Sequence, residues 1–273
     1  MKRNLWRIFV YILNYWFVRK RTLFSTIQHN TIQCDTMLIT IAFNNAFLID
    51  EQIRLVKKYI TDNNYAHIIV DNSSDFSKRK QIQNICIKEN IAYVALPKNP
   101  FTFLTKWSYS HGLALNWAYH NIINVRKPAF FGFIDHDLFP TKPYSVLQKI
   151  NNQDFYGRLI DMIDGWYLWA GFCFFNYQKI KNLDINFLPY KVGKNHTYLD
   201  TGGGNYPVFY SKYDKEKVVF AVPIVEKSIR EGNNYHSDFV HFIDNDWLHA
   251  INGSNWKKVK SKENILKQIL SEF

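Results

Sequence analysis

Short apolar runs alternate along the chain with longer stretches in which apolar positions recur every three or four residues. The apolar runs predict buried strands within residues 37–45, 67–74, 91–97 and the first half of 128–140. The helical spacing between them predicts helices over about 50–61, 78–90 and 109–123. Strands that alternate with helices in this way favour an α/β protein with a parallel sheet and right-handed crossovers.

Polar residues stand directly after the apolar runs. In open parallel sheets, ligands bind at the carboxyl ends of the strands, so these residues are the first candidates for a site. They are Asn44, Asn45, Asp71, Asn72, Asp135 and Asp137. Beyond about residue 155 the pattern is less regular, and GWYLWAGFCFF, LDTGGGNYPVF and VVFAVPIV are further segments that look like strands.

The first 24 residues differ from the rest of the chain. They carry six basic residues, no acid, and an apolar stretch over 5–18 that is shorter than the roughly 20 residues of a spanning helix. Large apolar residues recur in this stretch every three or four positions, as on one face of a helix. They are Trp6, Phe9, Leu13, Trp16 and Phe17. We expect an amphipathic helix lying in an anionic membrane interface; the alternative is a helix packed on the protein's own core.

Charge separates the chain into three parts. Residues 1–24 and 257–273 together supply nine of the eleven net positive charges, so the region 25–256 is nearly neutral. Terminal basicity of this kind does not predict a nucleic-acid partner, which would meet a basic stripe on the folded surface. We expect a membrane-surface helix (1–24), one folded domain (25–256) and a second basic helix (257–273).

Three widely spaced cysteines predict neither a disulfide framework nor a zinc site.

The motif Asp135-His136-Asp137 follows the apolar run AFFGFI. In an extended chain the two carboxylates would point to one side and His136 to the other. Two convergent carboxylates are typical ligands of Mg²⁺ or Mn²⁺. A second D-x-D, at Asp244 and Asp246, is expected by chance in a chain with this many aspartates, and the position at a strand end distinguishes the first. A solvated turn is the alternative.

Seven short motifs in this order resemble a GT-A glycosyltransferase, similar to the family 2 type. They span about residues 36–256 and read ITIAFNN, IIVDNSS, SHGLALNWA, GFIDHD, WAGFCFF, YLDTGGG and HAINGS. The resemblance implies a Rossmann-like, mostly parallel central sheet flanked by helices. It also implies a nucleotide-sugar donor, expected to be UDP-linked, with a divalent metal, Mn²⁺ or Mg²⁺, on its diphosphate.

The resemblance assigns roles to individual residues. Ala42, Phe43, Asn44 and Asp71 would line the nucleotide pocket, Asp135 and Asp137 match the metal-binding D-x-D, and Gly171 matches a glycine loop near the donor sugar. Asp200 matches the catalytic base of inverting members, although Leu199 stands where many members have Glu. His249 matches a histidine that completes the metal site, for which His236 and His241 compete.

One further pair is a candidate on physical grounds. His111 and Gly112 open a predicted helix, and a helix N-terminus suits a phosphate or ribose of the donor.

We therefore predict a metal-dependent, inverting transfer of a sugar to a hydroxyl of a glycan or lipid-linked acceptor, at the cytoplasmic face of a membrane. Two other functions stay open. A nucleotidyltransferase would use similar carboxylates, but the first strand is not followed by a Gly-rich loop with Lys or Arg. A non-catalytic membrane-associated scaffold would explain the terminal charge and would treat the acids as turns.

Overall fold

A computed structural model describes residues 2–27, 33–101, 107–228, 239–251 and 262–273. Its central sheet has the strand order β1-β4-β3-β2-β5-β8-β7. The four middle strands are parallel, whereas β1, β8 and β7 each run antiparallel to the strand beside them. The strands are β1 Phe24–Ser25, β2 Thr36–Ala42, β3 Tyr65–Asp71, β4 Ala92–Ala95, β5 Phe130–Asp135, β7 Phe155–Met162 and β8 Gly165–Asn176.

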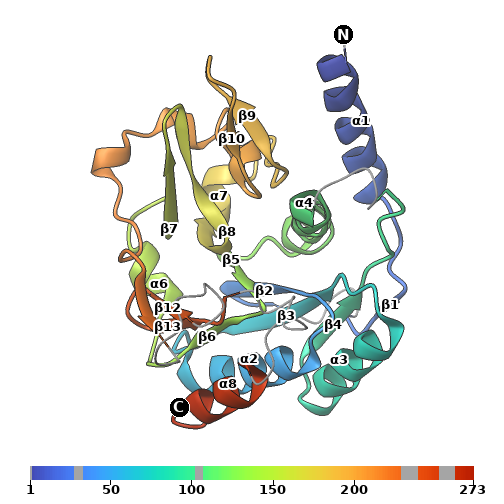
Figure 1. Cartoon of the computed structure of the whole chain (residues 1–273), viewed down its shortest axis with the longest axis vertical. Helices are drawn as coiled ribbons and strands as arrows, with labels where there is room; N and C mark the ends of the chain where they lie inside the picture. The colour runs from blue at the N-terminus through green and yellow to red at the C-terminus, as the bar shows by residue number, and fades with distance from the viewer. Residues whose placement is uncertain (1, 28–32, 102–106, 229–238, 252–261) are drawn as a thin grey trace.

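Helices cover both faces of this sheet (Figure 1). On one face lie α2 (Ala46–Tyr59) and α3 (Phe76–Lys88), and on the other lies α4 (Trp107–Ala118), which continues through a π-helical turn (Tyr119–Ile123) into α5 (Asn124–Arg126). All seven residues of β2 are buried, which explains why its sequence is apolar apart from Thr36 and Thr40. The predicted fold class, an α/β protein with a mostly parallel central sheet flanked by helices, is confirmed.

The predicted strands and helices of the first half form close to their expected positions. Both α2 and α3 begin two to four residues before their predicted positions, and a polar side chain caps each N-terminus. The Asn45 side chain accepts a hydrogen bond from the Leu48 N–H, and Asp75 accepts from the N–H groups of Ser77 and Lys78.

A second, four-stranded antiparallel sheet is built from distant segments. Its order is β11-β12-β13-β6. The strands are β6 Leu138–Pro140, β11 Val225–Ser228, β12 Phe239–Ile243 and β13 Trp247–His249. Smaller elements lie between these strands. They are a hairpin of β9 (Tyr190–Val192) and β10 (Thr197–Leu199), the short helices α6 (Val146–Ile150) and α7 (Tyr177–Ile180), and 3-10 turns at Gly203–Asn205, Tyr210–Lys212 and Lys215–Lys217.

Two of the segments expected to be strands in the second half are mostly turns or irregular chain. Residues 200–209 form turns and a 3-10 helix, because Gly202 adopts a left-handed backbone at φ 97° and reverses the chain. In residues 218–225 only Val225 enters a strand. GWYLWAGFCFF, by contrast, is the long strand β8.

The N-terminal helix α1 (Lys2–Phe17) packs on α4 with part of the side that was expected to face lipid. Leu13 and Phe17 are buried there, and Phe9 packs against the same cluster. Trp6 and Trp16, the other two residues of that predicted face, are exposed. Residues 24–25, in β1, join the central sheet through β4. Within the described residues, the structure has no helix with the length and apolar character needed to cross a bilayer.

The C-terminal helix α8 (Lys262–Leu270) also packs on the protein. Its Leu266 and Leu270 are fully buried in a cluster with Leu48 and Leu55 of α2. Residues 257–261 of the predicted basic helix lie outside the described residues, as does His236.

Candidate active site

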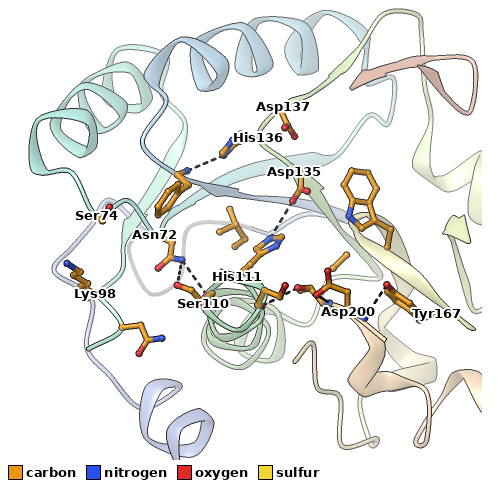
Figure 2. A pocket seen from close by; sticks show the side chains of 17 residues that line it. Asn72, Ser74, Lys98, Ser110, His111, Asp135, His136, Asp137, Tyr167 and Asp200 are labelled. Carbon is orange, nitrogen blue, oxygen red and sulfur yellow. Dashed lines mark hydrogen bonds and ion pairs between the residues drawn. The ribbon is translucent and has the colours of Figure 1, made fainter. Parts of the chain in front are cut away.

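A cavity of about 570 Å³ opens at the carboxyl ends of β2, β3 and β5, beside the N-terminal half of α4 (Figure 2). It is the place where the strand-end argument predicted a ligand site. Six of the predicted site residues line it: Phe43, Asn72, His111, Asp135, Asp137 and Asp200. The lining also includes Ser74, Lys98, Asn99, Ser108, Ser110, Tyr167, Trp169 and Thr201.

The D-x-D motif is a turn between two strands. Asp135 is the last residue of β5, His136 and Asp137 form the turn, and β6 begins at Leu138. Because the chain bends here, the strand alternation predicted for this motif is wrong. His136 lies on the same cavity as both carboxylates, and its Nδ1 accepts a hydrogen bond of 3.1 Å from the Phe43 N–H. This bond ties the motif to the end of β2.

A buried side chain of α2 holds the turn from behind. The Gln52 amide nitrogen donates to the backbone carbonyls of Asp135 and Leu138, each at 2.7 Å. Its Oε1 accepts from the Thr40 hydroxyl at 2.7 Å, and His67 Nε2 lies 2.9 Å from that hydroxyl oxygen. All polar atoms of the Gln52 side chain are thus engaged, so the turn is fixed against α2.

Asp135 pairs with a histidine from α4. His111 Nε2 lies 3.4 Å from Asp135 Oδ1, across the cavity. Burial raises the pKa of the Asp135 carboxyl and the neighbouring Asp137 raises it further, whereas His111 acts in the opposite direction.

Asp137 pairs with a histidine from the second sheet. His249, at the end of β13, places Nε2 3.5 Å from Asp137 Oδ1. The backbone supports this contact, because Leu138 of β6 is in register with His249 and the Ala250 N–H donates to the Asp137 carbonyl. The ring of Trp169 lies against His249, with 5.0 Å between centroids. Of the competing histidines, His241 contacts Glu226 at 2.8 Å instead.

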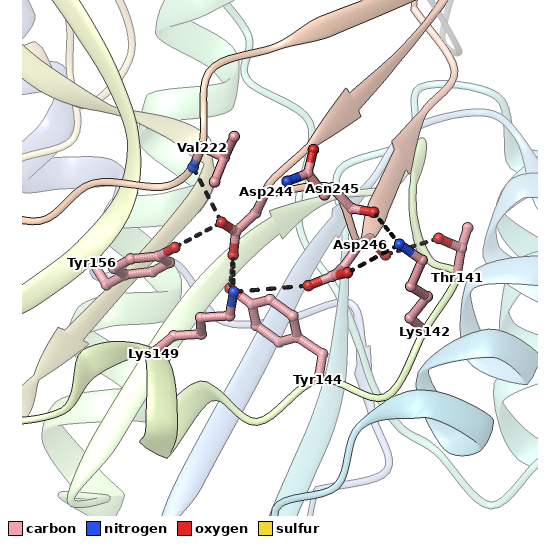
Figure 3. A network of polar contacts seen from close by, with 9 residues as sticks. All are labelled: Thr141, Lys142, Tyr144, Lys149, Tyr156, Val222, Asp244, Asn245 and Asp246. Carbon is pink, nitrogen blue, oxygen red and sulfur yellow. Dashed lines mark hydrogen bonds and ion pairs between the residues drawn. The ribbon is translucent and has the colours of Figure 1, made fainter.

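The second D-x-D has a structural role in the hairpin that carries His249 (Figure 3). The Asp244 carboxylate is buried and accepts hydrogen bonds from Tyr144, Tyr156 and the Val222 N–H, and Lys149 Nζ lies 2.8 Å from it. Asp246 contacts Lys142 and Lys149 at longer distances. These contacts fix the turn between β12 and β13 and leave both acids outside the cavity.

Asp200 lies on the opposite wall from the D-x-D turn. It follows β10, and its Oδ1 accepts a hydrogen bond of 2.8 Å from the Thr201 N–H. The Asp200 N–H donates to the Tyr167 hydroxyl at 3.2 Å, and Thr201 Oγ1 donates to the Ser108 carbonyl. Its carboxylate is thereby positioned on the cavity wall without an ion-pair partner among the contacts that the structure shows within the described residues.

The two glycines have different surroundings. A Cβ at Gly171 would lie 2.4 Å from Asp135 Oδ2 and 2.4 Å from the Trp169 ring, so this position must lack a side chain for the carboxylate to sit where it does. At Gly112 a Cβ would lie 2.9 Å from the Phe187 carbonyl. Gly112 therefore permits α4 to pack closely on that segment and does not line the cavity.

Three of the residues that were expected to bind the nucleotide of the donor lie behind the cavity wall. Ala42 and Asp71 are fully buried, and the Asp71 carboxylate accepts hydrogen bonds of 2.7 Å from both the Ser73 N–H and the Tyr93 hydroxyl. Asn44, at φ 50°, joins the ends of β2 and β3, because its side chain bonds to the Ser74 hydroxyl and backbone. These residues shape the wall that Phe43 and Asn72 present.

Sequence reasoning missed Lys98, Tyr167 and Trp169. Lys98 comes directly after an apolar run, so the strand-end rule already pointed to it. Tyr167 and Trp169 alternate within β8, where nothing in the sequence distinguishes a cavity-facing aromatic from a core one.

Two pairs of side chains lie at separations that suit a divalent metal. Two ligand atoms of one octahedral ion at about 2.1 Å lie roughly 3 Å apart, close to the separations of Asp137 from His249 and of Asp135 from His111. Among the described residues there is no cluster of three or more His, Cys, Asp or Glu arranged for a metal. Asp137 and His249 would thus supply one carboxylate and one imidazole and leave positions for substrate phosphates and water.

Comparison with solved structures finds similar folds in glycosyltransferases. The chain is similar to a mannosyltransferase from Pyrobaculum calidifontis solved with GDP-Man and Mn²⁺, at 11% identity and a TM-score of 0.41, over 64% of this chain and 52% of that one. It is also similar to the mannosyltransferase Ktr4p from S. cerevisiae, at 10% identity and 0.38, over 66% and 67%. A third is the galactosyltransferase LgtC, at 16% identity and 0.37, over 52% and 58%.

The chain spans about half the length of the first of these proteins. No family model matches the sequence, and no curated protein matches it. With TM-scores below 0.5, the likenesses do not carry the assignment below, which rests on the geometry of the cavity.

Proposed function

We propose that this protein is a glycosyltransferase that moves a sugar from a nucleotide-sugar donor to a hydroxyl of its acceptor. One observation carries the proposal: a single cavity at the strand ends brings together the D-x-D carboxylates and Asp200, which lie far apart in the sequence. The carboxylates of Asp135 and Asp137 suit a metal-bound diphosphate, and Asp200 suits an acceptor hydroxyl. One cavity would thus hold both the metal-bound diphosphate of the donor and the hydroxyl of the acceptor.

The donor would lie between α4 and the D-x-D turn. Asp137 and His249 would hold a divalent metal, and Phe43 on the cavity wall would face the nucleotide. Lys98 and the hydroxyls of Ser108 and Ser110 line the same cavity and can bind anionic or polar groups of the donor. When bound, the metal supplies positive charge that stabilises the departing nucleoside diphosphate.

Asp200 would act as general base toward the acceptor. Its carboxylate accepts the proton of the acceptor hydroxyl as that oxygen attacks the anomeric carbon. The proton then rests on Asp200, the bond from the anomeric carbon to the diphosphate oxygen breaks, and the nucleoside diphosphate leaves. A base on the side opposite the leaving group gives inversion, which is the stereochemistry we propose.

Thermal unfolding with nucleotides tests this proposal. UDP or GDP should raise the Tm of the wild type by about 5 °C at roughly 100 times its Kd, and only with Mn²⁺ or Mg²⁺ present. Asp137→Asn should lose the metal-dependent part of this rise. Asp246→Asn is the matched control, because Asp246 belongs to the other D-x-D and lies outside the cavity.

A Tm that no nucleoside diphosphate raises would contradict the proposal. An equal metal-dependent rise in wild type and Asp137→Asn would refute the metal assignment alone.

A further inference from the structure

The N-terminal helix α1 has two apolar faces, and only one of them packs on the protein. Leu13 and Phe17 are buried against α4. The opposite face is exposed and, among its described side chains, carries large apolar and aromatic residues. They are Leu5, Ile8, Tyr11, Ile12, Tyr15 and Trp16. Contiguous exposed apolar surface of this kind marks an interaction site.

Basic residues stand beside this exposed face. Arg19 and Lys20 follow the helix directly, and their cationic groups lie over the rings of Tyr15 and Trp16, at 3.3 Å and 3.7 Å from the ring centroids. Arg21 is exposed as well, and the chain contains no acid before Asp35. Apolar side chains, ring residues and adjacent positive charge together match the boundary between the headgroups and acyl chains of an anionic bilayer.

We infer that the exposed face of α1 binds the surface of an anionic lipid bilayer. Ile8 and Ile12 lie at the centre of the face and would enter the acyl boundary, whereas Tyr11, Tyr15 and Trp16 would lie at headgroup level. Arg19 and Arg21 would contact the lipid phosphates. This surface shares only Trp16 with the face that the sequence pattern suggested.

The packed face of α1 makes this contact rigid. Asn14 Oδ1 accepts a hydrogen bond of 2.8 Å from Asn116 of α4, and the Trp117 indole donates to the Lys20 carbonyl at 3.0 Å. Since α4 also carries Ser110 and His111 into the cavity, a bilayer bound to α1 has a fixed orientation relative to that cavity. If the proposed sugar transfer is correct, the acceptor is accordingly a membrane-presented hydroxyl.

Vesicle co-sedimentation of the full-length protein tests the inference. Wild type should bind phosphatidylglycerol–phosphatidylcholine vesicles, and Ile8→Ser/Ile12→Ser should bind them at least about tenfold more weakly, because two buried apolar side chains are lost. The matched control is Phe76→Ser/Ile87→Ser. Those two residues are exposed on α3, at 82% and 53% against 56% and 58% for Ile8 and Ile12, and their loss should leave binding unchanged.

A variant that removes two positive charges measures the electrostatic part of vesicle binding. Arg19→Gln/Arg21→Gln should lower binding to anionic vesicles by about fivefold for each charge and leave the weak binding to pure phosphatidylcholine unchanged. Equal vesicle binding by wild type and the double serine variant would overturn the inference. A second result would also overturn it: the wild type does not bind vesicles and is a dimer, and the double serine variant is a monomer. A second copy of the chain would then cover the exposed face.

These outcomes are independent of the sugar-transfer proposal. Vesicle binding is measured without a nucleotide, and the double serine variant should keep the Tm rise that nucleotide and metal give.

Discussion

Gln52 and Asp135 are joined by a hydrogen bond of 2.7 Å in which the Gln52 side-chain amide donates to the Asp135 backbone carbonyl. The same nitrogen donates to Leu138, so one buried side chain fixes both ends of the D-x-D turn. Gln52→Met would fill a similar volume but leave two carbonyls and the Thr40 hydroxyl without these partners. We expect a loss of about 3 kcal/mol in the free energy of unfolding, measured by urea denaturation.

Gln81→Met is the control for this substitution. Gln81 is exposed on α3, so the free energy of unfolding should change by less than about 0.5 kcal/mol. A Gln52→Met protein as stable as wild type would show that the turn holds its shape without α2.

Gly171→Ala should disturb the site and leave the fold intact. The added Cβ would press on both the Asp135 carboxylate and the Trp169 ring, so both groups must move. We expect turnover of a nucleotide sugar to fall about 10²-fold, as for a misplaced catalytic group. Gly165→Ala, in the same strand but facing Tyr206, should keep its turnover. Wild-type turnover in Gly171→Ala would mean that the observed position of Asp135 is not needed.

Asp200→Asn tests the proposed base. The amide oxygen can still accept the hydrogen bond from the Thr201 N–H, so the wall should keep its shape. Transfer should fall by a factor on the order of 10² to 10⁴, while the Tm rise with nucleotide and metal is retained. Asp161→Asn, an exposed acid paired with Lys215, is the control. Full transfer with lost nucleotide binding would instead assign Asp200 to the donor pocket.

His67 should make stability fall in acid. Burial lowers its pKa from about 6.5 to about 3, so the unfolded chain takes up a proton in a pH range where the folded protein does not. The free energy of unfolding therefore keeps its full value above pH 6.5 and declines by about 1.4 kcal/mol per pH unit as the pH falls from there toward 3.

A comparison of slopes measures this effect. His67→Gln should lose that part of the slope between pH 6 and 4.5 in urea titrations, whereas the exposed His196→Gln should keep it. Identical slopes in all three proteins would mean that His67 is protonated in the folded state.

The strands of the first half were predictable because their burial on both faces requires a mainly apolar run, as in β2, where only Thr36 and Thr40 are polar. The position of Asp135 and Asp137 followed from the same rule, since polar residues at the end of such a strand meet a ligand crevice. Boundaries were less accurate, because α2 begins directly after its cap Asn45, whereas the prediction placed its start near residue 50.

Other features depend on contacts that no local pattern records. Gln52 is a polar residue in a helix and is indistinguishable in sequence from a solvated one, yet it is fully buried against the turn. The direction of His136 depends on a bend whose partner, Phe43, follows the end of another strand, β2. Which face of α1 is covered depends on α4, because apolar residues surround most of that helix.

The contact between Asp137 and His249 also orders events during synthesis. A polypeptide leaves the ribosome N-terminus first, at roughly 5–20 residues per second, and folds as its segments become available. All four parallel strands precede Asp137, so they can pair while His249 has yet to be made. The strand ends that form one wall of the cavity can therefore assemble before β13 docks beside β6 and brings His249 to Asp137. If these two residues hold a metal as proposed, sugar transfer would begin only after this late hairpin is in place.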